Sequence, residues 1–182
     1  MNNNNDSNDN EHGDTRETVR EVVIVYGGEL AQDVADRIIA SRPTVANPTA
    51  TVTKRSASER PQRLVDDLGS DAVVCFVLQT IENASPTEDG GTTVRYFKRK
   101  THPATLLQGN KFRYAVLGLG DSNLLLDRQT TSARDCNQVA QQFDARLAAL
   151  GATRQCPLGM ADERTGLSEV EPWIQTFWKS FE

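Results

Sequence analysis

The sequence of 182 residues lacks several features that mark common classes of protein. Its cysteines, Cys75, Cys136 and Cys156, are far apart, no Cys-x-x-Cys pair occurs, and only His12 and His102 add imidazole groups. This scarcity of ligands argues against a zinc site, and we expect no metal-binding residues. The odd number and wide separation of the cysteines also favour reduced thiols, so we expect a cytoplasmic protein.

Long hydrophobic runs and clusters of basic residues are also missing. No apolar stretch approaches the ~20 residues that a membrane-spanning helix needs, and no signal peptide is recognisable. The net charge is −5, and Lys and Arg are scattered along the chain, which argues against nucleic-acid binding. No nucleophile–base pair is evident either, so the sequence identifies no independent catalytic residues and leaves enzymatic activity open.

Apolar residues are almost absent from the N-terminal segment, which is acidic and rich in Asn. We therefore expect residues 1–19 to form a disordered tail and residues 20–182 to form one folded domain.

Within that domain, short apolar runs alternate with segments of helical periodicity. The expected strands are Val22–Tyr26, Ala50–Thr53, Ala72–Leu78, Phe112–Leu117 and Thr153–Leu158. The expected helices are Leu30 to about Ser41, Glu59–Leu68, Thr92–Thr101, Asp135–Leu150 and Ser168–Phe181, with Ser168 as N-cap of the last.

This alternation predicts an α/β fold with a doubly wound, five-stranded parallel sheet and helices on both faces. Strands one, three and four are apolar on both sides, whereas strand two alternates as an edge strand does. The pattern fits the sheet order 2-1-3-4-5, in which ligands bind over the loops after strands one, three and four. These loops begin at Gly27, Gln79 and Gly118, and we expect the last to be a tight glycine turn.

Several ordered motifs resemble the flavodoxin-like FMN domains of diflavin reductases, the class that includes cytochrome P450 reductase and methionine synthase reductase. The resemblance covers roughly Val22 to Phe181. It is carried by Leu117-Gly-Leu-Gly-Asp-Ser-Asn123, Cys136-Asn137, Phe143–Gly151, Gly159-Met-Ala-Asp162 and Glu171-Pro-Trp173.

That resemblance implies an FMN-binding electron-transfer domain. Such a domain accepts electrons from an NADPH/FAD reductase module or protein and passes them to a protein acceptor, and the flavin carries the chemistry. The cofactor-binding residues that it implies are Gly27, Gly28, Glu29, Leu30, Ala31, Gln79, Thr80, Ile81, Glu82, Asn83, Ala84, Gly118, Leu119, Gly120, Asp121, Ser122, Asn123, Leu124, Asn137 and Asp162.

Each of the three loops departs from the family pattern. The phosphate loop is about two residues shorter than the family's loop and contains no Ser or Thr, and Glu29 lies where the phosphate dianion is expected. Glu82 and Ala84 replace glycines, and Leu124 replaces the aromatic residue that stacks on the isoalloxazine ring. These departures favour an alternative, in which the same fold has a degenerate flavin site and acts as an interaction or regulatory module.

Overall fold

The computed structural model describes residues 18–44, 50–82, 84–125 and 132–182. The expected tail and Asn83 therefore lie outside the described residues, apart from Thr18 and Val19. Val19 is buried against one of the two apolar clusters of the core. Among the described residues, no helix is long and apolar enough to cross a membrane.

Strands and helices alternate along the chain, as the sequence predicts. The strands are β1 (Glu21–Gly27), β2 (Thr51–Ser56), β3 (Ala72–Ile81), β4 (Ser85–Pro86), β5 (Arg113–Gly120) and β6 (Gly159–Asp162). The helices are α1 (Glu29–Ala40), α2 (Gln62–Asp67), α3 (Glu88–Phe97), α4 (Gln138–Ala149) and α5 (Val170–Lys179), and the 3-10 turns are η1 (Ser122–Leu124) and η2 (Glu163–Thr165).

The sheet confirms the predicted topology. Its order is β2-β1-β3-β5-β6, and all these neighbours pair in parallel. The short strand β4 pairs antiparallel with β3 only. With β4 set aside, the order is the expected 2-1-3-4-5, so the carboxyl ends of β1, β3 and β5 meet at one edge of the sheet.

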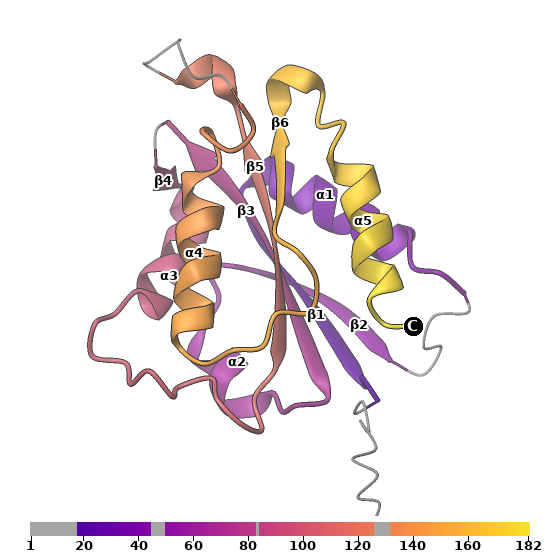
Figure 1. The fold of residues 1–182 in the computed structure, drawn as a ribbon, viewed down its shortest axis with the longest axis vertical. Helices are drawn as coiled ribbons and strands as arrows, with labels where there is room; N and C mark the ends of the chain where they lie inside the picture. Colours follow the sequence, from indigo (N-terminus) through magenta and orange to yellow (C-terminus); the bar gives the residue numbers. More distant parts are fainter. Residues whose placement is uncertain (1–17, 45–49, 83, 126–131) are drawn as a thin grey trace, which may run out of the picture.

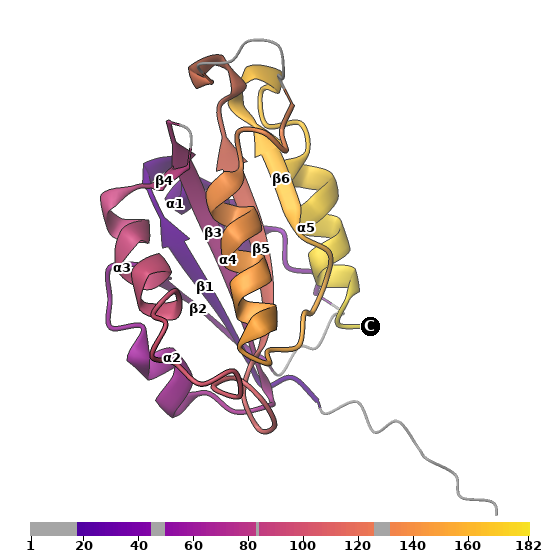
Figure 2. The same cartoon turned by 60° about the vertical axis from the view of Figure 1, so that its left-hand side comes forward.

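Helices cover both faces of this sheet (Figures 1 and 2). On one face, α2, α3 and α4 pack on alternate residues of β3 and β5, with Phe76, Phe97 and Phe143 in edge-to-face contact. On the other face, α1 and α5 cover the intervening residues, including Cys75 and Val77 of β3. Successive residues of a strand point to opposite faces, so Gln79, which follows Leu78, points to the face that α1 covers.

Several predicted boundaries are wrong, and glycines account for some of them. The expected glycine turn at Gly118 is strand, because β5 continues to Gly120. A Cβ on Gly118 would lie 2.5 Å from Asn137 Oδ1, and one on Gly120 would lie 2.3 Å from the carbonyl oxygen of Cys136. These glycines therefore let the segment that leads into α4 pack directly on the strand.

The predicted polar loop from Gln79 and helix from Thr92 are also displaced. Strand β3 continues to Ile81, and α3 begins at Glu88, because the Thr87 hydroxyl accepts the N–H of Gly90 and caps the helix. A Cβ on Gly27 would lie 2.6 Å from the Cα of Gly90, so the missing side chain of Gly27 allows the close approach of α3 to β1.

The predicted fifth strand, Thr153–Leu158, is wrong as well. Only Arg154 of this segment forms a bridge, to Tyr114, and its guanidinium instead holds the buried carboxylate of Asp144 at 2.9 and 2.6 Å. The strand that takes this place beside β5 is β6, which begins at Gly159, directly after the predicted segment.

Two helix starts also differ from the prediction. Helix α2 begins at Gln62 rather than Glu59, directly after Pro61, which suits the start of a helix. Ser168 is not the N-cap of the last helix, because Glu169 holds that position, without a side-chain cap.

Candidate functional site

The candidate site is the sheet edge where β1, β3 and β5 end. Among the described residues, the exposed large hydrophobic side chains are Ile81, which is 41% exposed, and Leu124, which is 53% exposed. Ile81 ends β3 and Leu124 ends η1, directly after β5, and β3 and β5 are neighbours in the sheet. An apolar ligand at this edge would remove both side chains from water.

At the first loop, β1 passes into α1 through a single non-helical residue. Gly28 has φ 116° and ψ 158°, a conformation that only glycine adopts readily, and it provides no side-chain cap. Glu29 is exposed and lies in the first turn of α1, where a carboxylate interacts favourably with the helix dipole. Leu30 is half-buried and Ala31 is fully buried in the core, so at Ala31 only the backbone faces the loop.

The N-terminus of α1 has a partner that the sequence reasoning missed. Gln79 Oε1 accepts the backbone N–H of Leu30 at 3.1 Å. The parallel register explains the contact: Gly27 pairs with Leu78, so Gln79 is the next residue along β3 and lies beside Gly28. No local pattern signals this cap, because it depends on the alignment of two strands that are far apart in sequence.

At the second loop, Thr80 is part of the core, whereas Glu82 and Ala84 face solvent. Thr80 is buried, and its hydroxyl accepts the N–H of Val139 at the start of α4, at 3.3 Å. Glu82 has φ 51°, a left-handed conformation that favours glycine, and Ala84 is exposed. Of the two glycine positions in the family pattern, the one that Glu82 occupies thus coincides with backbone strain.

The third loop is built around Asp121, whose carboxylate accepts the N–H of Asn123 at 2.9 Å and starts η1. Ser122 is buried, and Asn123 and Leu124 are exposed, so the turn presents its last two residues to solvent. Leu119, in β5, is wholly buried, which leaves only its backbone near the edge.

Asn137, the residue before α4, lies inside the protein. It is fully buried, and its amide donates to the carbonyl oxygens of Ala133 at 2.6 Å and Ala161 at 2.8 Å. Its position therefore joins α4 to β6, and its neighbour across the packed interface is Gly118. Asn137 and Gly118 thus lie against each other where α4 meets β5.

Asp162, at the end of β6, joins the third loop to η2. Its buried carboxylate accepts the N–H groups of Ser122 and Arg164, each at 3.0 Å. Burial raises the pKa of Asp162, but the hydrogen bonds from Ser122 and Arg164 outweigh it and hold that pKa below its usual value. The carboxylate is therefore charged at neutral pH and fixes the loop through backbone donors.

A second acidic residue at this edge is Glu163, the first residue of η2. Desolvation raises its pKa, and the nearby carboxylates of Asp121 and Asp162 raise it further. Asp121 caps η1 and Asp162 caps η2, and these two turns are in contact, so Asp121, Asp162 and Glu163 form an acidic cluster around them. The guanidinium of Arg164 lies 3.9 Å from the Asp162 carboxylate.

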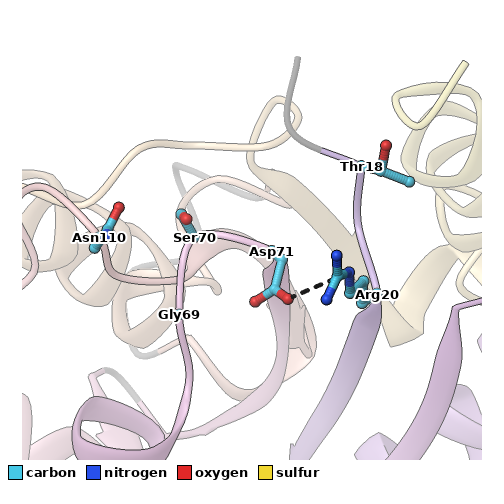
Figure 3. A pocket seen from close by; sticks show the side chains of 6 residues that line it. All are labelled: Thr18, Arg20, Gly69, Ser70, Asp71 and Asn110. Atoms are coloured by element: carbon cyan, nitrogen blue, oxygen red, sulfur yellow. Dashed lines mark ion pairs between the residues drawn. The ribbon is translucent and has the colours of Figure 1, made fainter. Parts of the chain in front are cut away.

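The opposite edge of the sheet holds a separate hollow of about 420 Å³ (Figure 3). Its lining residues are Thr18, Arg20, Gly69, Ser70, Asp71 and Asn110. Arg20 and Asp71, 3.9 Å apart, directly precede β1 and β3, so this hollow lies at the amino ends of the strands. Ligands of doubly wound sheets bind at the carboxyl ends, and we therefore do not assign the functional site here.

A parallel sheet of this order, with helices on both faces and loops gathered after β1, β3 and β5, defines the flavodoxin-like class of doubly wound domains. The chain belongs to the flavodoxin family, since the family model described as Flavodoxin matches residues 29–175. FMN-type electron transfer is the general function of this family.

Curated relatives agree with this assignment. The chain is 31% identical over 172 residues to "NADPH-dependent diflavin oxidoreductase 1" of Danio rerio, covering 87% of the chain and 24% of the relative. It is 28% identical over 170 residues to "NADPH--cytochrome P450 reductase" of Musca domestica, covering 88% of the chain and 22% of the relative. It is 26% identical over 157 residues to "Methionine synthase reductase" of Caenorhabditis elegans, covering 86% and 21%.

These names confirm the resemblance to diflavin reductases. The chain spans less than a quarter of the length of each of these relatives.

Proposed function

We propose that this chain is an FMN-binding electron-transfer domain that accepts electrons from an NADPH/FAD reductase module and passes them to a protein acceptor. The family and the names of the relatives support the class of function. The observation that carries the proposal is the exposure of Ile81 and Leu124 on adjacent loops at the ligand edge of the sheet.

The described residues fit one end of FMN and not the other. Ile81 and Leu124 provide apolar surface for the isoalloxazine ring, beside backbone that Asp121 and Asp162 hold in place. At the N-terminus of α1, by contrast, the hydroxyl donors of the family pattern are absent, and Gln79 takes the N–H of Leu30. The ring site is therefore the stronger part of the proposal.

FMN, when bound, would supply the electron-carrying chemistry, and the chain would supply binding, exclusion of water and charge. The cluster of Asp121, Asp162 and Glu163 places negative charge beside the proposed ring site. Negative charge of this kind opposes the addition of electrons to a neighbouring group. It also suits a basic surface on a protein partner, which we take to be the reductase module or the acceptor.

We place this function in the cytoplasm. All three cysteines are free and buried, as expected in a reducing compartment.

Titration of the purified chain with FMN and with riboflavin tests the proposal, with quenching of flavin fluorescence as the readout. We expect saturable binding of FMN at concentrations of about 10 μM or below, which corresponds to roughly 7 kcal/mol. NADPH alone should leave the bound flavin oxidised, and NADPH with an FAD-containing reductase should bleach its absorbance. No quenching by either flavin at ~100 μM would leave the interaction module as the better account.

A pair of variants tests the ring site itself. Leu124→Asp places a charge on the proposed platform and should weaken binding of both flavins by about tenfold or more, because it removes roughly 1.5–3 kcal/mol of apolar contact. Asn110→Asp adds the same charge at the opposite edge of the sheet, where the residue is exposed, and should leave both affinities unchanged. Equal effects of the two variants would contradict the placement of the site.

A further inference from the structure

The N-terminus of α1 is the point at which a parallel α/β sheet offers backbone donors to an anion. In this chain a side chain of the protein already accepts from one of these donors, because Gln79 Oε1 accepts the N–H of Leu30 at 3.1 Å. Gln32 makes the first intrahelical bond of this end, to Gly28, so Leu30 carries one of the N–H groups that a helix leaves unpaired.

Two features of the fold determine the position of Gln79, the alternation of side chains along β3 and the register of β3 with β1. Gln79 follows Val77 by two residues, so its side chain points to the face that α1 covers, and the register places it beside Gly28. A Cβ on Gly28 would lie 2.1 Å from Gln79 Oε1, so the space above Gly28 is already filled by the amide. The same Cβ would lie 3.0 Å from Cγ2 of Thr87, the N-cap of α3, so this residue also adjoins the space above Gly28.

The charge at this helix end also opposes the binding of an anion. Glu29 provides a carboxylate in the first turn of α1, and no basic side chain is part of this loop, Tyr26 to Ala31. A phosphate dianion would have to displace the Gln79 amide and accept a like charge nearby. A neutral ligand end meets neither obstacle.

We propose that Gln79 is a specificity residue that occupies the phosphate position of the flavin site, so that the chain binds the flavin ring with little preference for FMN over riboflavin. This inference rests on the proposed function, because it concerns the ligand of that same site. The shortened first loop and Gln79 then form one feature: the loop leaves the helix end open, and the amide of the neighbouring strand closes it.

The first experiment compares both flavins on the wild-type chain and on variants of Gln79. For the wild type, we expect the dissociation constants of FMN and riboflavin to agree within about threefold, less than 1 kcal/mol. Gln79→Ala frees the Leu30 N–H and the space above Gly28, and should tighten FMN by about fivefold or more, with riboflavin changed by less than about twofold.

Two further variants serve as controls. Gln79→Leu keeps the volume of the side chain but removes its oxygen, so it should leave FMN as weak as in the wild type. Gln175→Ala makes the truncation on the exposed side of α5 and should change neither affinity. A wild-type preference for FMN of about tenfold or more, or an unchanged ratio in Gln79→Ala, would overturn the inference and leave the proposed function standing.

The second experiment needs no flavin. In ¹H–¹⁵N spectra, addition of ~10 mM inorganic phosphate should shift the Leu30 amide resonance in Gln79→Ala and leave it unmoved in the wild type, because only the variant has a free donor. If neither flavin binds to any variant but this shift occurs, the proposed function fails and the occupation of the helix end by Gln79 is supported. A shift in the wild type as large as in the variant would refute that occupation.

Discussion

Removal of the negative charge of Asp162 should destabilise the protein at neutral pH and have little effect in acid. Asp162→Asn keeps the shape of the side chain, so Ser122 and Arg164 still find an oxygen acceptor. Hydrogen bonds to a charged acceptor contribute about 1.5–3 kcal/mol, against about 0.5–1.5 kcal/mol for a neutral one. With two such bonds, and with relief of the burial of a charge as an offset, we expect a loss of about 1–2 kcal/mol at pH 7.

The pH dependence gives the prediction its sign. The pKa of Asp162 is lower in the folded chain than the unfolded value of about 3.9, so its charge stabilises the fold above that value. The stabilisation is lost as pH falls through the lowered pKa, because protonated Asp162 then resembles Asn. The difference between wild type and variant should therefore be constant from about pH 7 to 5 and shrink below about pH 4.

Urea unfolding at several pH values measures this difference. Asp67→Asn, which removes an exposed carboxylate at the end of α2, is the control and should change stability by less than about 0.5 kcal/mol. A cost for Asp162→Asn that is the same in acid as at neutral pH, or no cost at pH 7, would show that the charge does not hold the third loop.

The remaining predictions concern single residues of the same edge. Gly120→Ala should lower the free energy of unfolding by roughly 1–3 kcal/mol in urea, because its Cβ would lie 2.3 Å from the Cys136 carbonyl oxygen; wild-type stability would disprove the packing. Glu82→Gly should raise stability by up to about 1 kcal/mol, since φ 51° strains any residue with a Cβ, and a lower melting temperature would count against this strain. In the Gln79→Ala background, where the helix end is open, Glu29→Thr should tighten FMN by about a further 1 kcal/mol in a fluorescence titration and leave riboflavin unchanged; equal gains for both would exclude a phosphate effect.

Much of the fold was predictable because local patterns and tertiary packing agree. The apolar runs that became β1, β3 and β5 are buried on both faces, and their order in the sheet follows from the two-sided burial of parallel strands. Helix α4 likewise presents its apolar stripe, with Phe143 and Leu147, to the core.

Several of the wrong boundaries share a physical cause, which is glycine inside regular structure. Gly120 and Gly159 are typical of loops in a sequence, yet both lie in strands. A Cβ on Gly159 would lie 2.5 Å from Trp173 Cδ1, just as one on Gly120 would meet Cys136. Such glycines mark places where another element packs closely on the backbone, and the packed partner is distant in sequence.

The candidate site shows the same limit. The three loops could be placed from topology alone, because parallel strands bring their carboxyl ends together. The partner of the α1 N-terminus could not, because the contact of Gln79 with Leu30 follows from the pairing of Gly27 with Leu78. A motif comparison records only that the first loop is short and lacks hydroxyl groups.

That distinction changes how the departures from the family pattern are interpreted. A short phosphate loop with Glu29 suggests, by itself, a site that has decayed, and decay would leave the donors of α1 unpaired or exposed to water. Instead, Gln79 supplies an acceptor at 3.1 Å from the Leu30 nitrogen, while Ile81 and Leu124 remain exposed at the ring end. A site that is closed at its anionic end and open at its apolar end is the arrangement expected for a neutral flavin ring, and the comparison of FMN with riboflavin separates it from a decayed one.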